Sequence, residues 1–420
     1  MAYETELRRE RVLLAGCHLP KQSLERFDHS MGELKALTQT AHGETVGVVT
    51  QNRERIHPAF YAGRGKIEEM AEIVEELEVE TVIFNGELSA GQAGNIASML
   101  GVKVIDRTQL ILDIFADRAR SKEGKLQVEL AQLKYLLPRL SGKGTSLSRL
   151  GGGIGTRGPG ETKLEQDRRH IRRRITDIEK QLDTIVHHRE RYRERRRRNQ
   201  SFQISLVGYT NAGKSTLFNK LTDAGTFEEN LLFATLDPLT RKFQLPSGLE
   251  VLASDTVGFI QDLPTTLIAA FRSTLEEIKE ANLILHVIDA ENPDFEQHEE
   301  TVLRLLKELG ADTIPILTVY NKIDLLEEAF IASQGTRSVS ISALKEKDID
   351  LLKQEIENVM KEEMTYYQAS IPLAEGKLLS KLGTESFIDQ QKIDEESGTV
   401  QIKGYISADL PLYAELKPYF

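Results

Sequence analysis

The sequence predicts an α/β protein with several domains, and three observations lead to this class. Strand and helix patterns alternate through residues 1–110, two apolar helical stripes follow in residues 111–200, and a strand, a glycine-containing loop and a helix succeed one another from Phe202. The chain has 420 residues, enough for about three domains of ordinary size. A hydrophobic fraction of 40% and a charged fraction of 28% exclude collagen, disulfide scaffolds and global disorder.

Four short apolar runs in the first part of the chain are predicted strands. They are Val12–Ala15, Thr45–Thr50, Thr81–Phe84 and Lys103–Ile105, and helices are expected at Lys66–Leu77 and Gly91–Leu100. This alternation favours a small parallel sheet with helices on its faces. The histidines of this part are scattered without metal-ligand spacing, so no catalytic constellation is predicted here.

Residues 111–200 carry two apolar stripes at helical spacing. The first consists of Leu126, Leu130, Leu133 and Leu137, and Pro138 is expected to end it. The second consists of Ile171, Ile175, Ile178, Leu182 and Ile185. Two stripes of similar length joined by a loop predict an antiparallel helical hairpin in which each stripe packs against the other.

The loop between the stripes, Ser141–Thr162, contains eight glycines. Its segment Gly153–Gly158 matches GxGxxG, but no strand precedes it and Pro159 follows at once, so a dinucleotide site is rejected. Glycine permits close approach to a phosphate backbone, and nearby cations would release counterions. The loop is therefore interpreted either as a nucleic-acid contact or as a flexible exposed linker.

The formal net charge of −11 hides a strong asymmetry along the chain. Residues 1–116 carry a net charge of −6, residues 117–200 carry +12 and residues 201–420 carry −17. Arginine dominates the basic block, in the runs Arg168–Arg174 and Arg189–Arg198, and its planar guanidinium suits phosphate. We expect a nucleic-acid partner for this block, with a merely solvated helix face as the alternative.

The segment Gly208–Ser215 reads GYTNAGKS and matches GxxxxGKS. It follows the predicted strand Phe202–Val207 and precedes a predicted helix that begins at Thr216, the setting that a phosphate loop requires. Backbone N–H groups of such a loop wrap the phosphates, and the helix N-terminus favours an anion. Lys214 is expected to reach the β- and γ-phosphates, and the Ser215 hydroxyl to bind Mg²⁺.

Two further motifs indicate which nucleotide is bound. Asp255–Gly258 has the form DxxG after the predicted strand Leu249–Ser254, so its acid would hold Mg²⁺ through water and its glycine N–H would meet the γ-phosphate. Asn321–Asp324 has the form NKxD after the predicted strand Ile316–Tyr320. A carboxylate there accepts hydrogen bonds from guanine N1–H and the 2-amino group, which adenine cannot match.

Two loops complete the expected site. Ser342–Leu344 follows the predicted strand Ser338–Ile341 and fits the remaining base-contact loop. Asn230–Pro238 is expected to be a mobile loop that offers a hydroxyl to Mg²⁺ and an N–H to the γ-phosphate, ordering with the triphosphate and releasing after hydrolysis. Thr235 is the first candidate for that hydroxyl, and Thr240 is the second.

These motifs resemble those of the HflX family of bacterial ribosome-associated GTPases, within the translation-factor-like branch of P-loop GTPases. The resemblance covers essentially the whole chain. It is carried by GGGIGTRGPGETKLEQDRR (Gly151–Arg169), GYTNAGKSTLFN (Gly208–Asn219), FATLDP (Phe233–Pro238), DTVGFI (Asp255–Ile260) and NKID (Asn321–Asp324).

The resemblance implies four domains: an N-terminal α/β domain at 1–110, the helical hairpin at 111–200, the P-loop GTPase domain at 201–363 and a small C-terminal α+β domain at 364–420. Thr399–Tyr405 is the expected strand of the last. The family also implies GTP hydrolysis to GDP and phosphate, binding to the large ribosomal subunit and its RNA, and GTP-dependent splitting of ribosomes. The hairpin loop would then approach the peptidyl-transferase region.

The motifs and the resemblance together define the expected site residues. The catalytic residues are Lys214, Thr235 and Gly258, and the Mg²⁺ ligands are Ser215 and Thr235, with Asp255 acting through water. The residues expected to contact GTP are Gly208, Tyr209, Thr210, Asn211, Ala212, Gly213, Lys214, Ser215, Thr216, Phe233, Ala234, Thr235, Leu236, Asp237, Asp255, Thr256, Val257, Gly258, Asn321, Lys322, Ile323, Asp324, Ser342, Ala343 and Leu344. The residues expected to contact RNA are Arg149, Arg157, Lys163, Arg168, Arg169, Arg172 and Arg173.

Two positions bear on the rate of hydrolysis. Phe259 follows Gly258 where many GTPases have a glutamine that orients the attacking water, so slow intrinsic hydrolysis is expected and the water-positioning group is left open. Asn211 resembles an asparagine that helps to bind K⁺ beside the phosphates in related GTPases. A side-chain bond that only stabilises the loop is the alternative.

Three other functions stay open at this point. One is a P-loop ATPase or small-molecule kinase, against which the NKxD motif argues. Another is a GTPase that acts on an RNA other than the ribosome, such as transfer RNA, and the third is a nucleotide-gated binding module. Cys17 is the single cysteine, no apolar run reaches the roughly 18 residues of a membrane span, and the N-terminus is charged, so we expect a soluble, cytoplasmic monomer.

Overall fold

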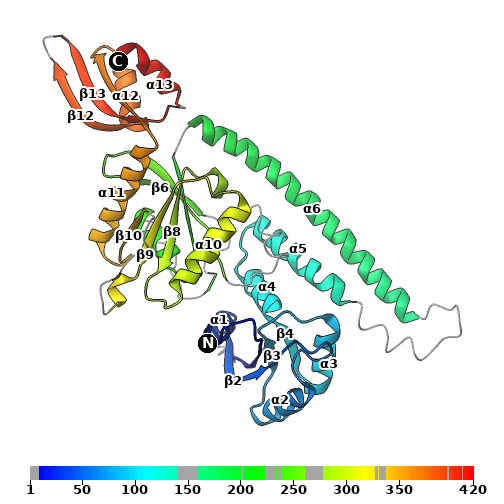
Figure 1. The fold of residues 1–420 in the computed structure, drawn as a ribbon. Helices are drawn as coiled ribbons and strands as arrows, with labels where there is room; N and C mark the ends of the chain where they lie inside the picture. The colour runs from blue at the N-terminus through cyan, green and yellow to red at the C-terminus, as the bar shows by residue number, and fades with distance from the viewer. Residues whose placement is uncertain are drawn as a thin grey trace, which may run out of the picture. The chain divides into compact units, whose positions relative to one another are not determined.

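The structure is a computed structural model that describes residues 9–140, 159–199, 202–222, 232–233, 239–260, 278–326, 330, 337–394, 397–408 and 410–420. Within these ranges the side chains of residues 159–164 and 186–199 are not described. The chain divides into two compact units (Figure 1). The first unit is Met1–Val186 with Leu231–Leu236 and Gln261–Arg272, and the second is His187–Asn230, Asp237–Ile260 and Ser273–Phe420.

A four-stranded parallel sheet, in the order β2-β1-β3-β4, forms the centre of the first unit. Its strands are β1 (Glu10–His18), β2 (Gly43–Asn52), β3 (Thr81–Phe84) and β4 (Lys103–Asp106). Helices α2 (Arg64–Glu76) and α3 (Ala90–Leu100) share one apolar core with the sheet, where Leu13, Ile67, Val82 and Ile96 are buried. The predicted strands and both predicted helices are confirmed, with longer bounds for β1 and β2.

Helix α1 (Leu24–Thr40) was missed by the sequence analysis. Its N-terminus is capped by Ser23, whose side chain accepts the Arg26 N–H at 3.3 Å. The helix packs on β1 at Gly16, where an added Cβ would lie 2.6 Å from Met31 Sδ. The sequence did carry the signal, a serine followed by Phe27, Met31, Leu34 and Leu37 at helical spacing, all of which are buried.

Asp106, at the end of β4, links this sheet to the helices that follow. Its buried carboxylate caps α4 (Arg107–Arg118) by accepting the Gln109 N–H at 2.9 Å. It also accepts the Leu88 N–H at 2.8 Å, the Tyr135 hydroxyl at 2.7 Å and the Arg139 guanidinium at 3.2 Å. Because a buried carboxylate is stable only when its oxygens are satisfied, this cluster fixes α5 against the sheet.

Helices α5 (Lys122–Arg139) and α6 (Pro159–Asn199) form the predicted antiparallel hairpin (Figure 1). Leu126, Leu130 and Ile178 are buried in its seam, and Leu133, Ile175, Leu182 and Ile185 pack against them. The seam is flanked by a two-bond pair between Arg174 and Glu129, at 2.7 and 2.8 Å.

The end expected at Pro138 agrees to within one residue, because helix α5 ends at Arg139. One predicted boundary in the hairpin is wrong. Helix α6 begins at Pro159, so residues 159–162 are helical and do not belong to the glycine-rich loop. Proline fits the first helical position because its missing N–H would have no partner there. The rest of that loop lies outside the described residues.

A six-stranded sheet, in the order β10-β9-β8-β5-β7-β6, forms the centre of the second unit. All neighbours are parallel except β6 and β7. The strands are β5 (Gln203–Gly208), β6 (Leu239–Gln244), β7 (Glu250–Asp255), β8 (Leu283–Asp289), β9 (Ile316–Asn321) and β10 (Ser338–Ser340). Helices α7 (Lys214–Thr222) and α11 (Glu346–Glu362) cover one face, and α10 (Phe295–Leu309) contacts β5 and β8 on the other.

A three-stranded antiparallel sheet, in the order β11-β13-β12, ends the chain. It consists of β11 (Thr365–Pro372), β12 (Phe387–Asp394) and β13 (Thr399–Ile406), and packs on α12 (Gly376–Glu385) and α13 (Pro411–Leu416). The predicted strand Thr399–Tyr405 is therefore confirmed. Phe387 and Tyr405 pack against the core of the six-stranded sheet, so the two sheets of this unit share one apolar contact.

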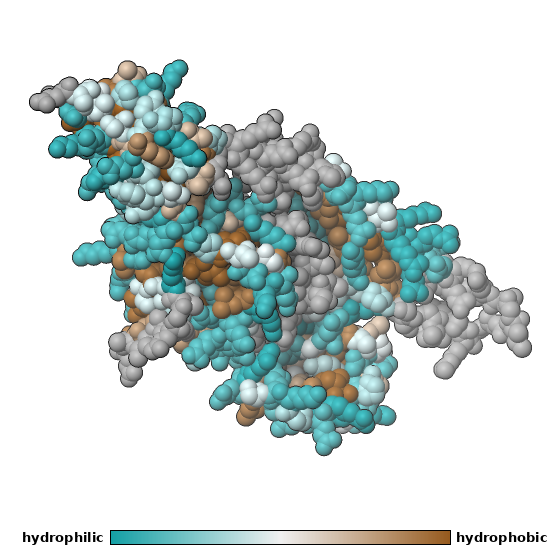
Figure 2. Space-filling model, turned by 45° about the horizontal axis from the view of Figure 1, so that its top comes forward, coloured by the Kyte–Doolittle hydropathy of each residue, from teal (hydrophilic) through white to brown (hydrophobic). Residues whose placement is uncertain are grey.

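On the face shown in Figure 2, hydrophilic side chains cover most of the described residues, and apolar side chains form scattered patches between them. Among the described residues, no helix is both long and apolar enough to cross a membrane.

Candidate nucleotide site

The phosphate loop Gly208–Ser215 joins the carboxyl end of β5 to α7, and its backbone leaves no room for side chains at two positions. Gly208 and Gly213 have φ angles of 155° and 89°. A Cβ at Gly208 would lie 2.1 Å from the Val287 carbonyl oxygen, and one at Gly213 would lie 2.3 Å from Asn321 Nδ2. These glycines allow the loop to pack directly on β8 and β9.

The DxxG segment lies directly beside the phosphate loop. The Thr210 N–H donates to the Phe259 carbonyl at 2.8 Å, and the Phe259 N–H donates to the Gly208 carbonyl at 3.1 Å. Gly258 lies within this pairing, because a Cβ there would be 2.9 Å from Thr210 Cγ2 and 3.0 Å from Lys214 Nζ. The structure thus brings Lys214 and Gly258, two of the predicted catalytic residues, next to each other.

Lys214 begins α7 and is almost fully buried, with 6% of its surface exposed. Its Nζ donates to the Tyr209 carbonyl at 2.7 Å. Burial lowers the pKa of Lys214 to about 8, and the charge of Asp255 opposes that shift only in part. Among the described residues no carboxylate pairs directly with this ammonium group, so the cation lacks the counterion that a phosphate would provide.

Ser215 and Asp255, both predicted to serve Mg²⁺, are in direct contact. The Ser215 hydroxyl donates to Asp255 Oδ2 at 2.9 Å, and the carboxylate is buried at the end of β7. Hydroxyl and carboxylate oxygens are the ligands that Mg²⁺ prefers in proteins, so this pair fits that ion. In the described part of the chain, no group of three or more His, Cys, Asp and Glu side chains gathers in a metal-binding arrangement.

Asn321 is the last residue of β9, and its side chain links the phosphate loop to the predicted base-contact loop Ser342–Leu344 by hydrogen bonds. Its Nδ2 donates to the Ala212 carbonyl at 3.0 Å, and its Oδ1 accepts the Ala343 N–H at 2.9 Å. Both bonds are buried, so the amide of Asn321 is used within the protein and positions two loops at once.

Lys322 and Asp324 follow Asn321 toward the surface. Lys322 has a left-handed backbone, with φ of 67°, and its Nζ donates to Asp289 Oδ2 at 2.6 Å. Asp324 lies in the short 3-10 helix Ile323–Leu325 and is exposed, so its carboxylate faces solvent. The N–H of Ser342 donates to Asp348 Oδ2 at 2.8 Å, which holds the neighbouring loop.

Sequence reasoning missed two contacts of this site. The ring of Tyr209 stacks flat on that of His298 of α10, with centroids 3.6 Å apart and planes 5° from parallel. Residues far apart in the sequence give no pairing signal, so this anchor had no sequence signature. Asp289, the partner of Lys322, carried a weak signal because it ends the apolar run Leu283–Ile288 at the same sheet edge as the motifs.

The structure does not describe every predicted site residue. Thr235 and its neighbours Ala234, Leu236 and Asp237 lie outside the described residues, as do Arg149 and Arg157. Thr240, the second candidate for Mg²⁺, lies on β6, where its hydroxyl is 3.0 Å from Ser254 Oγ. Of the predicted RNA contacts, Arg169, Arg172 and Arg173 are exposed on α6, Arg168 is half-buried, and the side chain of Lys163 is not described.

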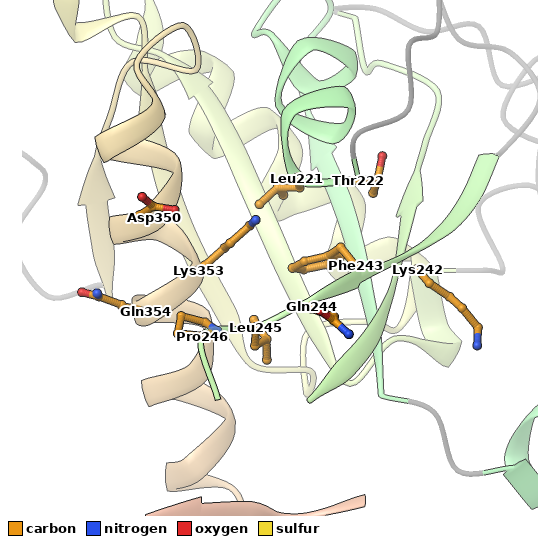
Figure 3. Close-up of a pocket in the computed structure, with 10 residues that line it drawn as sticks. All are labelled: Leu221, Thr222, Lys242, Phe243, Gln244, Leu245, Pro246, Asp350, Lys353 and Gln354. Atoms are coloured by element: carbon orange, nitrogen blue, oxygen red, sulfur yellow. The ribbon is translucent and has the colours of Figure 1, made fainter. Parts of the chain in front are cut away.

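A groove of about 630 Å³ between α7, β6 and α11 is separate from these motifs (Figure 3). Its lining residues are Leu221, Thr222, Lys242, Phe243, Gln244, Leu245, Pro246, Asp350, Lys353 and Gln354. None of the predicted nucleotide, metal or RNA residues lines it, so it is not the nucleotide site.

The arrangement of the motifs defines the class of protein. A parallel sheet whose strand β5 leads through GxxxxGKS into a helix, with DxxG and NKxD at the ends of β7 and β9, is that of a P-loop GTPase.

Comparisons with known proteins give the particular family. Family models match three consecutive parts of the chain: GTP-binding GTPase N-terminal at residues 28–116, GTP-binding GTPase Middle Region at 118–196 and 50S ribosome-binding GTPase at 203–322. The GTPase HflX of Alkalihalophilus pseudofirmus is 55% identical over 97% of this chain and 96% of its own length. The GTPase HflX of Escherichia coli K12 is 42% identical over 88% of each chain.

A solved structure of a GTP-binding protein from Sulfolobus solfataricus in complex with GDP aligns with 83% of this chain and 98% of its own, at 26% identity and a TM-score of 0.46. The identity to the sequence relatives establishes the family. The chain belongs to the HflX family of GTPases, as its motifs indicated, and is a GTP-hydrolysing enzyme.

A first prediction concerns Phe259, at the position where many GTPases have glutamine. Its side chain is 2% exposed and its backbone is paired with the phosphate loop, so it faces the interior. We expect Phe259→Gln to lower the melting temperature, because a buried amide without partners costs about 1–3 kcal/mol, and not to raise the rate of GTP hydrolysis. Thermal unfolding and single-turnover hydrolysis measure both effects. Phe259→Leu is the apolar control, and a tenfold faster Phe259→Gln would contradict the interpretation.

Proposed function

We propose that this GTPase binds the large ribosomal subunit and splits or recycles stalled or idle ribosomes in a GTP-dependent cycle. The observation that carries the proposal is the basic block of residues 117–200, with a net charge of +12 in a chain of net charge −11. A local field of this kind favours a polyanionic partner, which the average charge conceals. The match of residues 203–322 to a family described as 50S ribosome-binding GTPases supports ribosomal RNA as that polyanion.

The described arginines of α6 support an RNA-facing surface. Arg169, Arg172 and Arg173 are spaced three and four residues apart, so they share one side of the helix. Seam residues such as Ile178 fall on the opposite side of the helix. Arg174 belongs with the seam, since it pairs with Glu129. The three exposed arginines therefore lie on the outer face of the hairpin, where Arg172 also pairs with the exposed Glu165 at 4.0 Å. An exposed pair of this kind contributes little, so a phosphate can replace the carboxylate.

At the nucleotide, each motif residue has a proposed role. Lys214 would neutralise the β- and γ-phosphates, the Gly258 N–H would meet the γ-phosphate, and Asp324 would accept the N1–H and 2-amino protons of guanine. Mg²⁺ would be held by Ser215 and Thr235, with Asp255 acting through water, and would supply positive charge to the phosphate oxygens. The buried Phe259 has no polar group with which to orient water. We therefore propose that intrinsic turnover is slow and that the ribosome supplies a group or fixes the loops that speed it.

The remaining features of the proposal concern organisation and location. The four parts 1–110, 111–200, 201–363 and 364–420 would be separate domains. The first two would contact the ribosome, and the third would bind the nucleotide. We further propose a monomer that works in the reducing cytoplasm, which its single, buried cysteine Cys17 supports.

Co-sedimentation with large subunits tests the proposal directly. We expect pelleting with a non-hydrolysable GTP analogue and little pelleting with GDP. Replacing Arg169, Arg172 and Arg173 by glutamine should weaken binding and flatten its logarithmic salt dependence by about 2, since each lost phosphate contact removes about 0.7–0.9 from the slope.

A charge-matched control variant separates contact from net charge. Lys377, Lys392 and Lys417 are exposed in the C-terminal sheet region, and their replacement by glutamine removes the same three charges. This control should bind as the wild type does. Equal weakening by both triple variants would mean that the arginines are only a solvated face, and absence of nucleotide-dependent pelleting would overturn the ribosome proposal.

We also propose that Asn211 helps to bind K⁺ beside the phosphates. Asn211 is exposed and has a left-handed backbone with φ of 64°, so its amide is accessible to an ion in solvent. The expected result is faster GTP hydrolysis in K⁺ than in Na⁺ at equal ionic strength, with the difference lost in Asn211→Ala. Equal rates in the two salts would leave Asn211 with the loop-stabilising role alone.

A further inference from the structure

Helix α10 carries none of the nucleotide motifs, yet one of its side chains contacts the phosphate loop. The imidazole ring of His298 lies flat on the phenol ring of Tyr209, the second residue of the loop, with the ring centroids 3.6 Å apart and the planes 5° from parallel. Each of the two residues is only 5% exposed. A buried contact between two aromatic rings restricts the rotamers of both side chains. The side chain of Tyr209 is therefore held against α10.

The main chain around Tyr209 is held as well. The Thr210 N–H donates to the Phe259 carbonyl at 2.8 Å, and the Phe259 N–H donates to the Gly208 carbonyl at 3.1 Å, so both neighbours of Tyr209 are paired with the DxxG segment. The carbonyl group of Tyr209 itself accepts a hydrogen bond from Lys214 Nζ at 2.7 Å. One residue thus connects a ring of α10 to the ammonium group of the phosphate loop.

Lys214 depends on this contact because its ammonium group is buried. The residue is 6% exposed, and the hydrogen bond that the structure gives to its Nζ is the one to the Tyr209 carbonyl. A lysine side chain has many rotamers, so its charged end stays in one place only while its acceptor does. A cation that is in place before the phosphate arrives lowers the cost of binding, since less ordering remains to be done.

We propose that His298 is a positioning residue for the lysine of the phosphate loop. Its ring fixes Tyr209, and the carbonyl of Tyr209 fixes the ammonium group of Lys214. The proposal rests on the role proposed above for Lys214 at the phosphates, and it is independent of the ribosome proposal. Without the stack the nucleotide itself must order the loop, and that cost reduces its affinity.

Nucleotide binding and hydrolysis without ribosomes test the proposal. His298→Ala removes the ring, and we expect the Kd for GDP and the KM for GTP to rise about 5- to 10-fold, the value of a stacked aromatic pair. We expect kcat to change less than about twofold, because the stack supports the ground state and the transition state equally. Titration calorimetry gives the Kd, and steady-state hydrolysis separates KM from kcat.

Two other substitutions at the same position separate the ring from its nitrogen atoms. His298→Phe keeps a ring and loses the nitrogens, and it should bind GDP within about twofold of the wild type. His298→Gln keeps hydrogen-bonding groups and loses the ring, so it should behave as His298→Ala does. Rescue by glutamine in place of phenylalanine would overturn the proposal.

Leu306→Ala is the control for a general loss of packing in α10. Leu306 is 1% exposed and lies eight residues after His298, which is about 12 Å along the helix. This variant should lower the melting temperature and leave the Kd for GDP as in the wild type. An equal rise of Kd in Leu306→Ala, or a wild-type Kd in His298→Ala, would overturn the proposal and leave the stack with a structural role only.

Lys214→Met tests the role on which the proposal rests, because it keeps the aliphatic stem and removes the charge. We expect a larger loss of GDP affinity than in His298→Ala, since the phosphates lose the cation itself. Unchanged affinity in Lys214→Met would contradict the role of the lysine, and with it this proposal. A loss in Lys214→Met without any loss in His298→Ala would contradict the positioning role of His298 alone.

Discussion

The nucleotide site depends on one unsatisfied charge, the ammonium group of Lys214. It is buried, its described hydrogen bond goes to the Tyr209 carbonyl, and burial lowers its pKa to about 8. Because unfolded lysine has a pKa near 10.4, the folded chain without nucleotide holds this proton less tightly than the unfolded chain does. Below about pH 8 the buried ammonium group therefore lowers the free energy of unfolding. This destabilisation decreases as the pH rises from about 8 toward about 10.4, the pKa of lysine in the unfolded chain. A bound phosphate removes the same cost by supplying the counterion.

The loops around Lys214 are coupled through backbone contacts. Gly208 and Gly213 press the phosphate loop onto β8 and β9, and Asn321 joins the same loop to the segment that contains Ala343. On the other side, the paired backbones of Thr210 and Phe259 tie it to the DxxG segment. The phosphate loop is thus joined to the segment of Ala343 through the side chain of Asn321, and to the DxxG segment through two backbone hydrogen bonds. Phe259 cannot do the work of a glutamine, because its side chain is buried and has no polar group.

Much of this could be predicted from the sequence, because the signals were local. The order strand, glycine-containing loop, helix predicted the phosphate loop. The apolar stripe that includes Leu126, Leu130 and Leu133 predicted the seam of the hairpin. What was missed arises from contacts between distant residues: Tyr209 on His298, Asn321 on Ala212, and Asp106 as the acceptor for Tyr135 and Arg139. Strands β6 and β8 were also missed: β8 is an apolar run that carries no motif of its own, and β6 is an edge strand of mostly polar, exposed residues with no apolar alternation. The error at Pro159 arises because the first helical position tolerates proline, whose missing N–H has no partner there.

The central claim is that Lys214 is a desolvated cation completed by phosphate, and proton uptake on nucleotide binding tests it most directly. Burial lowers the pKa of Lys214 to about 8, and a bound phosphate raises it again, so GDP binding should take up protons, with uptake growing as the pH rises from about 7 to about 9. Calorimetry in buffers of different ionisation enthalpy at each pH measures the number of protons. An uptake near zero throughout this range would contradict the claim, because it would mean that Lys214 is already fully charged before the nucleotide binds.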